Sequence, residues 1–217
     1  GAEDRLKSIL REAADRSTAS DDLASRIDDW PTRYHLDRRR TNLLRPLHLG
    51  PGVRVLDAGA GTGVMSRYAA EAGATVVAVE GDARRAGLVA LRCEGTDVEV
   101  RCGAADEVDD PDGFDVVLAV GVLEYAAGRP GGAEVFLGRL AGLVRPGGVL
   151  AVAIENQLGL AYLLGADEDH LAHPWLGLEG YPTAEAGVRT YSRTALTALL
   201  TNAGLGNQLW LYPFPDY

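Results

Sequence analysis

The sequence has few of the residues that build disulfide frameworks, metal sites or membrane spans. Its two cysteines, Cys93 and Cys102, lack C-x-x-C spacing, which excludes a disulfide scaffold and indicates core or near-surface thiols. Its four histidines include no H-E-x-x-H pair, and His170 with His173 alone makes a poor zinc site, so no metal is predicted. No apolar run reaches the roughly 18 residues of a membrane span, so no membrane partner is expected.

Basic residues are also in the minority. The chain has 21 lysines and arginines against 31 aspartates and glutamates, a formal net charge of −10. Nucleic acid is therefore an unsuitable partner, because binding to a phosphate backbone depends on many basic contacts. The locally basic stretch 33–40 is expected to be a solvated helix face. The first residues are charged and helical in pattern rather than a secretory signal, so a cytoplasmic location is predicted.

What the sequence does contain is an alternating pattern from Val53 onward. With 217 residues the chain is long enough for one substantial core. Short β-branched apolar runs alternate with helical stretches, at residues 53–57, 75–80, 97–102, 114–120 and 148–155. This alternation predicts an α/β fold with a doubly wound, mostly parallel sheet. We expect an N-terminal helical cap over residues 1–50 and a core over 51–217.

The second half of the chain carries turn, loop and capping signals. Pro146, Gly147 and Gly148 are expected to end a helix at 133–144 and turn the chain into the fifth strand. Residues 165–190 show no steady period, which is typical of a functional loop, and a substrate lid is expected over 157–190. The last helix is expected between Ser192 as N-cap and Gly204 as stop, followed by another strand over 207–214.

A glycine-rich turn follows the first strand. That strand ends at Asp57, and Gly59, Gly61 and Gly63 then place backbone N–H groups beside space that no Cβ occupies. The dinucleotide fingerprint G-x-G-x-x-G is not matched, because the third glycine comes one residue early. A carboxylate before the glycines repels a pyrophosphate but attracts an ammonium group, such as that of S-adenosylmethionine. Glu80, at the end of the second strand, is placed to accept both hydroxyls of a ribose.

Two alternatives stay open for the glycines on this evidence alone: a tight turn without a ligand, and a site for NAD or FAD. The stretches "VLDAGAGTG", "VVAVEGD", "FDVVLAVGVLEY" and "RPGGVLAVAIEN", in this order, resemble the class I S-adenosylmethionine-dependent methyltransferases over residues 53–156. The resemblance implies S-adenosylmethionine as cofactor and S-adenosylhomocysteine as product. It implies that the acid before the glycines contacts the methionine part and that an acid after the third strand meets the adenine amine. The cofactor-binding residues so predicted are Asp57, Gly59, Ala60, Gly61, Gly63, Glu80, Gly81, Val120 and, because Ala104 stands where that acid is common, Asp106.

Methylation of a hydroxyl needs a general base as well as a bound cofactor. His170 is the leading candidate, because it lies in the irregular segment after the fifth strand, which can fold over the strand ends. Glu155 is expected to hold the imidazole in one tautomer and stabilise its protonated form, with Glu179 or Asp169 as alternatives. His35 is the main rival as base, and a surface-loop histidine without a catalytic role also stays open for His170.

Four residues are candidates for substrate binding. Tyr125 follows the fourth strand, at a position that points toward the reacting centre in this architecture, with packing at the sheet edge as the alternative. Asn156 follows the fifth strand and is expected to hydrogen-bond cofactor or substrate. Tyr181 and Arg189 are further candidates at the substrate mouth.

A longer set of motifs resembles a narrower subgroup. "YHLDRRRTNLLRPL", "GVLEYA", "IENQLGLAYLLGADEDH", "LEGY", "GVRTYSR" and "YPFPDY" look like methyltransferases associated with bacterial glycosyltransferases and O-methyltransferase domains embedded in modular polyketide synthases. For the polyketide-synthase members the resemblance implies a His base assisted by Glu, acting on the β-hydroxyl of a carrier-bound chain. These roles carry over to His170 and Glu155. Such chains usually continue further, which leaves open whether this one is an excised domain without its last strand.

We therefore predict an S-adenosylmethionine-dependent O-methyltransferase that acts on a hydroxyl of a natural-product intermediate. The β-hydroxyl of a polyketide chain tethered to an acyl carrier protein is preferred, within a larger multidomain synthase, and a free small molecule stays open. The alternatives are a sugar or polysaccharide precursor, methylation at nitrogen or carbon, and a catalytically silent docking module.

Overall fold

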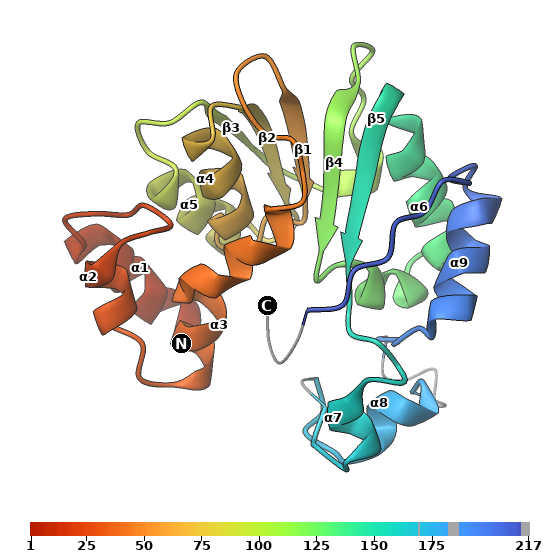
Figure 1. Cartoon of the computed structure of the whole chain (residues 1–217). Helices are drawn as coiled ribbons and strands as arrows, with labels where there is room; N and C mark the ends of the chain where they lie inside the picture. The colour runs from red at the N-terminus through yellow and green to blue at the C-terminus, as the bar shows by residue number, and fades with distance from the viewer. Residues whose placement is uncertain (169, 182–186, 214–217) are drawn as a thin grey trace. The chain divides into compact units, whose positions relative to one another are not determined.

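The structure is a computed structural model and describes residues 1–168, 170–181 and 187–213. The N-terminal elements are α1 (Ala2–Glu12), α2 (Asp21–Ser25), α3 (Trp30–Leu36) and the 3-10 helix η1 (Arg38–Leu44). Strands and helices then alternate in the order β1 (Arg54–Ala58), α4 (Val64–Glu71), β2 (Thr75–Glu80), α5 (Ala83–Arg92), β3 (Val98–Cys102), η2 (Ala105–Glu107), β4 (Phe114–Val120), η3 (Leu123–Gly128), α6 (Gly132–Gly142) and β5 (Val144–Ala153). The short helices α7 (Leu160–Leu163) and α8 (Leu176–Glu179) and the longer α9 (Arg193–Asn202) complete the chain (Figure 1).

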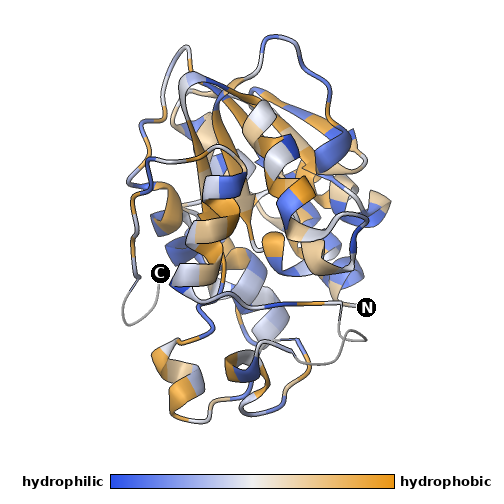
Figure 2. Cartoon of the chain, turned by 90° about the vertical axis from the view of Figure 1, so that its right-hand side faces the viewer, coloured by the Kyte–Doolittle hydropathy of each residue, from blue (hydrophilic) through white to orange (hydrophobic). Residues whose placement is uncertain are grey.

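The strands form a single sheet in the order β3-β2-β1-β4-β5. The pairs β1–β2, β2–β3 and β1–β4 are parallel, and Ala58 at the end of β1 lies opposite Val79 near the end of β2. The strands β1, β2 and β4 are largely buried, as expected for strands covered on both faces. Figure 2 shows the hydropathy of each residue along the chain. The predicted doubly wound parallel α/β fold is confirmed.

The chain divides into two compact units. The first comprises Gly1–Leu118, Val144–Val149 and the described residues from Leu211 onward, and the second comprises Ala119–Leu143 and Leu150–Trp210. The sequence-based division follows expected roles rather than contacts. It comprises a cap over 1–50, a core over 51–217 and a lid over 157–190, and it stays a prediction. Among the described residues, no helix combines the length and the apolar character that crossing a membrane requires.

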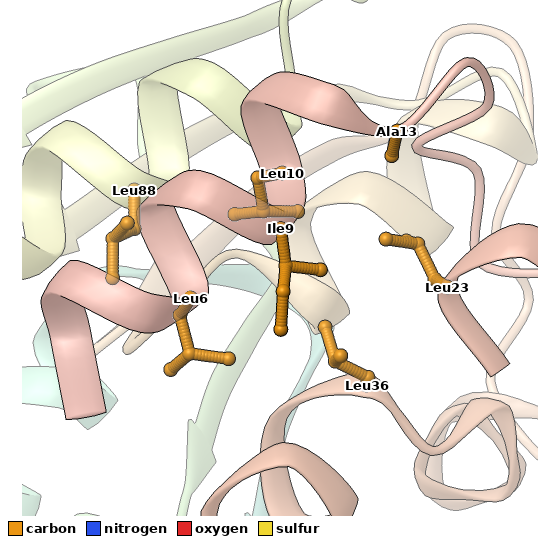
Figure 3. Packing of buried hydrophobic residues seen from close by; sticks show 7 residues of the cluster. All are labelled: Leu6, Ile9, Leu10, Ala13, Leu23, Leu36 and Leu88. Atoms are coloured by element: carbon orange, nitrogen blue, oxygen red, sulfur yellow. The ribbon is translucent and has the colours of Figure 1, made fainter. Parts of the chain in front are cut away.

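In the first unit, the N-terminal helices pack on α5. Leu6, Ile9 and Leu10 lie along one face of α1 and are buried, as is Ala13, the residue directly after this helix. They form one hydrophobic cluster with side chains from three other helices, Leu23 from α2, Leu36 from α3 and Leu88 from α5 (Figure 3). Burial of this cluster, rather than intrinsic helix propensity, therefore holds the N-terminal helices in place.

The two capping residues predicted for the last helix are confirmed. The Ser192 side chain accepts a hydrogen bond from the Ala195 backbone N–H and so begins α9, as predicted. Gly204 follows the helix with φ of +84°, in the left-handed conformation that ends helices. The two thiols also lie as expected, with Cys93 buried and Cys102 exposed.

Two predictions at strand boundaries were wrong. Pro146, Gly147 and Gly148 do not form a turn before the fifth strand but lie within β5. Because β5 is the last strand of the sheet, a proline without an N–H group is tolerated there. Residues 207–213 form no strand, and Leu209 and Tyr212 are 82% and 58% exposed, so their side chains gain no packing that would stabilise one. The rest of the predicted strand lies outside the described residues.

Candidate functional site

The turn between β1 and α4 depends on glycine in two different ways. Gly59, Gly61 and Gly63 have φ of +87°, +57° and +80°, in the left-handed region that favours glycine. A Cβ at Gly63 would lie 3.1 Å from the Cα atom of Val89, so this glycine allows α4 to pack closely on α5. A Cβ at Gly61 would meet nothing within 4 Å, so open space borders the turn at this residue.

Asp57 is a buried carboxylate directly before this turn. It is 2% exposed and accepts a 2.5 Å hydrogen bond from the hydroxyl of Ser66, in the first turn of α4. Burial raises the pKa of Asp57 to about 6, and the hydrogen bond from Ser66 opposes that rise only in part. The ionised carboxylate is therefore poorly compensated by the protein, and a cationic group brought to it gains a strong partner.

Glu80 joins the end of β2 to the glycine turn. Its Oε2 atom accepts a 2.8 Å hydrogen bond from the Gly61 N–H, and its Oε1 atom accepts one of 3.0 Å from the Asp82 N–H. Arg85 pairs with Oε1 at 3.2 Å. Two carboxylate oxygens offer about four acceptor positions, so Glu80 retains capacity for the hydroxyls of a ligand.

The remaining predicted cofactor residues occupy separate elements. Ala60 is 8% exposed within the turn, and its N–H donates to the Val79 carbonyl. Gly81 is exposed after β2, and Asp106 is partly buried in η2. Val120 is the last residue of β4 and belongs to the second unit.

The N-terminal rival base is a partly buried, neutral histidine. His35 Nδ1 lies 3.1 Å from the hydroxyl of Thr62, within the glycine turn, and its carbonyl accepts a 2.7 Å hydrogen bond from Arg92. Burial, together with the nearby charges of Arg40 and Arg92, lowers the pKa of His35 to about 4. A group with so low a pKa is a weak proton acceptor at neutral pH, which disfavours His35 as the general base.

In the second unit, His170 lies with two glutamates. Glu124 and Glu155 each place one carboxylate oxygen near one ring nitrogen of His170, and these three atoms all lie within 4.8 Å of one another. They come from η3, from the residues after β5 and from the segment after α7. Across the described ranges, Glu155 Oε2 and His170 Nε2 are enclosed atoms without a hydrogen-bond partner. The predicted pair of His170 and Glu155 is thus brought together, whereas Glu124, 3% exposed and directly before Tyr125, was missed.

Two tyrosines make edge contacts with the His170 ring. The Tyr125 hydroxyl lies 3.3 Å from His170 Nδ1, and the ring centroids are 5.4 Å apart with an interplanar angle of 82°. The Tyr181 ring lies 6.1 Å from the imidazole at 61°. His170 is therefore surrounded by carboxyl and phenol groups of its own unit.

A family described as a methyltransferase domain matches residues 17–208 of this chain. The chain belongs to this methyltransferase family. A ubiquinone biosynthesis O-methyltransferase from Nitrobacter winogradskyi is 29% identical over 134 residues, which are 61% of this chain and 50% of that protein. The chain thus spans about half the length of this curated relative.

Solved structures give the same fold. A SAM-dependent methyltransferase from Aquifex aeolicus aligns with a TM-score of 0.56 and 20% identity over 81% of this chain and 84% of that chain. The magnesium protoporphyrin IX methyltransferase from Synechocystis PCC 6803, with bound SAH, aligns with a TM-score of 0.54 and 17% identity over 93% and 72%. At these identities the likeness establishes the methyltransferase fold alone.

The buried acids of this methyltransferase fit the cofactor of class I methyltransferases. Asp57 offers a poorly compensated carboxylate for an ammonium group, Glu80 offers acceptors for hydroxyls, and Gly61 leaves the approach open. Two buried carboxylates suit this ligand better than a pyrophosphate. In the second unit, the spacing of Glu124, Glu155 and His170 is also compatible with a bound cation, so the sequence-based expectation of no metal stays a prediction.

The other predicted substrate residues of the methyltransferase have different surroundings. Asn156 Oδ1 accepts a hydrogen bond from the Leu158 N–H, within its own loop. Arg189 is exposed and borders a cavity of about 450 Å³, which Glu179 also lines. Tyr181 is 1% exposed and donates its hydroxyl hydrogen bond to Glu168. Their roles toward substrate stay predictions, and Asp169, the other alternative partner of His170, lies outside the described residues.

Proposed function

We propose that this methyltransferase binds S-adenosylmethionine and methylates a hydroxyl group. The bound cofactor supplies the electrophilic methyl group. Asp57 accepts hydrogen bonds from the cofactor ammonium group, and Glu80 accepts them from the ribose hydroxyls. The family membership and the buried positions of these two acids support this assignment.

The His170 cluster is the observation that carries the choice of a hydroxyl. An alcohol loses its proton as it is methylated, and His170 is the group available to take that proton. Glu124 and Glu155 provide negative charge within 4.8 Å, which stabilises the imidazolium that forms. Methylation of a neutral amine has less need of such a base, so the cluster supports O-methylation over N-methylation.

For the acceptor, we propose a hydroxyl on a largely apolar natural-product intermediate, with the β-hydroxyl of a carrier-tethered polyketide chain as the preferred case. Four leucines on and around α7 are exposed in the same unit as His170: Leu158, Leu160, Leu163 and Leu164. An apolar acceptor buries such side chains, whereas a sugar gains little from them. A sugar or polysaccharide precursor remains the second candidate, supported by the resemblance to glycosyltransferase-associated methyltransferases.

Mass spectrometry of methyl transfer tests this proposal. The chain is incubated with S-adenosylmethionine and a panel consisting of carrier-linked β-hydroxyacyl chains, hydroxylated aromatic rings and sugar nucleotides. We expect methylation of the β-hydroxyl. Methylation of sugars alone would overturn the acceptor class, and methylation at nitrogen or carbon would overturn the choice of a hydroxyl.

Substitution of His170 distinguishes two hypotheses, that the protein is an active methyltransferase and that it is a catalytically silent docking module. We expect His170→Ala to lower kcat by about 10²- to 10⁴-fold while the affinity for S-adenosylhomocysteine stays within about twofold. His48→Ala, at an exposed histidine of the first unit, is the matched control. Full turnover by His170→Ala rejects the base assignment, and tight cofactor binding without turnover of any acceptor favours the docking module.

A further inference from the structure

A buried carboxylate with no part in the proposed chemistry holds the segment that carries His170. Glu168 is 2% exposed. It accepts hydrogen bonds from the Tyr181 hydroxyl, from the His170 N–H at 2.8 Å and from the Leu171 N–H. Burial alone would raise the pKa of Glu168, but these donors together lower it, so the side chain is ionised at neutral pH.

The backbone around Glu168 closes on itself. The Ala172 N–H donates to the Glu168 carbonyl at 3.1 Å, and the Glu168 N–H donates to the His173 carbonyl at 3.4 Å. Asp167 and Pro174 form an isolated antiparallel bridge. Glu168 therefore contacts the His170 N–H with its side chain and the backbone of Ala172 and His173 with its own backbone.

This part of the chain also concentrates unfavourable backbone conformations. Within the described ranges, the non-glycine residues with positive φ are Ala172 at 53°, Trp175 at 71° and Tyr181 at 56°. Side chains disfavour this region, so such residues persist only where surrounding contacts hold them. Two of the three bond to Glu168: the Tyr181 hydroxyl donates to its carboxylate, and the Ala172 N–H donates to its backbone carbonyl.

Tyr181 connects the carboxylate to the imidazole. It is 1% exposed, its hydroxyl donates to Glu168, and its ring makes an edge contact with the His170 ring. Glu168 thus fixes the His170 backbone directly and one neighbour of its ring through Tyr181. Because catalytic groups displaced by about 1 Å lose roughly 10²-fold in rate, this restraint matters to a general base.

We propose that Glu168 and Tyr181 are positioning residues that set the location and orientation of the His170 imidazole for proton transfer. The inference rests on the proposed function, since it assumes that His170 is the base.

The test compares Glu168→Gln and Tyr181→Phe in the full chain. Glutamine keeps the shape but accepts through one oxygen only, and phenylalanine keeps the ring but removes the hydroxyl that reaches Glu168. We expect kcat to fall roughly 10- to 100-fold, while KM and the Kd for S-adenosylhomocysteine stay within about twofold. Matched controls are Glu134→Gln and Tyr212→Phe, both at exposed positions.

Two further readouts separate positioning from a merely structural role. The first readout is the NMR spectrum of protein labelled with ¹⁵N in its histidine rings. The His170 signals are assigned by their loss in His170→Ala, and we expect them to shift in Glu168→Gln and in Tyr181→Phe. The double variant loses about as much kcat as the worse single variant, because both substitutions break the same contact. The inference is rejected if kcat is unchanged, or if the loss of kcat disappears when the rate is expressed per folded molecule.

His170→Ala, measured in the same assay, distinguishes this inference from the proposed function. If His170→Ala keeps full turnover, the base assignment fails and the positioning role fails with it. If His170→Ala loses turnover while Glu168→Gln and Tyr181→Phe keep the wild-type kcat, only the positioning role fails.

Discussion

The imidazole of His35 and the hydroxyl of Thr62 lie 3.1 Å apart and tie α3 to the glycine turn. The carbonyl of the same histidine accepts a hydrogen bond from Arg92, the last residue of α5. The N-terminal region is therefore joined by polar contacts, as well as by its apolar cluster, to the residues that surround the proposed cofactor site.

Loss of the Thr62 hydroxyl tests this connection. Thr62→Val leaves the partly buried His35 Nδ1 without its partner, which costs about 1 kcal/mol in the free energy of unfolding. We expect weaker binding of S-adenosylhomocysteine in calorimetric titration, because Thr62 lies within the glycine turn. Thr194→Val, exposed on α9, serves as control. An effect of Thr62→Val no larger than that of the control would contradict the connection.

The raised pKa of Asp57 predicts how cofactor binding depends on pH. Ionised Asp57 attracts the ammonium group, so affinity for S-adenosylhomocysteine is full above pH 7 and falls as the pH drops through about 6. By pH 5 the loss is roughly tenfold. Calorimetric titration between pH 5 and 8 measures it, and Asp57→Asn is expected to bind weakly at every pH. A wild-type affinity that is flat over this range would count against the assignment.

The raised pKa of Asp57 also makes stability depend on pH. Without cofactor, the protein is expected to lose stability as the pH rises, whereas its affinity for cofactor increases. The pKa of Asp57 is higher in the folded state than its ordinary value of 3.8, so its contribution to stability is largest at acid pH and is lost as the pH rises through about 6. Ionised Asp57 thus destabilises the empty protein at pH 8, by an amount on the order of 3 kcal/mol. We expect Asp57→Asn to raise Tm at pH 8 and to lose this advantage toward pH 4. Asp112→Asn, at an exposed site, is the control.

Chelation tests whether the His170 cluster acts through a metal. If the imidazole accepts the proton itself, turnover persists after treatment with EDTA and is not raised by Mg²⁺ or Zn²⁺. The assay is methyl transfer before and after dialysis against chelator. Activity that disappears with EDTA and returns with one cation would assign Glu124, Glu155 and His170 to that cation instead.

The apolar cluster of the N-terminal helices predicts a large cavity effect. Leu10 is fully buried within it, so Leu10→Ala is expected to lower the free energy of unfolding by about 2–5 kcal/mol. Leu164→Ala, at a side chain that is 77% exposed, is expected to change it by less than about 0.5 kcal/mol. Urea denaturation compares the two variants, and equal losses would show that the cluster contributes little.

The sheet was predictable because its strands carry their signal locally. Runs such as 75–80 and 114–120 are continuous, apolar and β-branched, and the structure ends those strands at the same residues. At Pro146 the local signal misled, since a proline that suggests a turn is also tolerated in an edge strand. At residues 207–213 the sequence predicts a strand and the structure has none, because an apolar run forms a strand only where a partner strand is available.

The site was predictable only in part, for a related reason. Asp57, Glu80 and the glycines belong to a motif of fixed spacing, so their proximity follows from local sequence. Ser66, Glu124 and Glu168 were missed, although each lies beside or close to a residue that attracted attention. Their importance comes from contacts made by the fold, and a single sequence carries no spacing rule for such contacts. The closeness of each to such a residue in the chain was the signal available.

The hydrophobic cluster that α1 shares with α5 also bears on synthesis of the chain. Leu6, Ile9 and Leu10 leave the ribosome well before Leu88 is made, because translation adds only about 5–20 residues per second. During that interval the apolar face of α1 has Leu23 and Leu36 as partners but lacks Leu88. The nascent chain therefore passes through a stage in which this face is open to chaperones or to another nascent chain, and completion of α5 closes it.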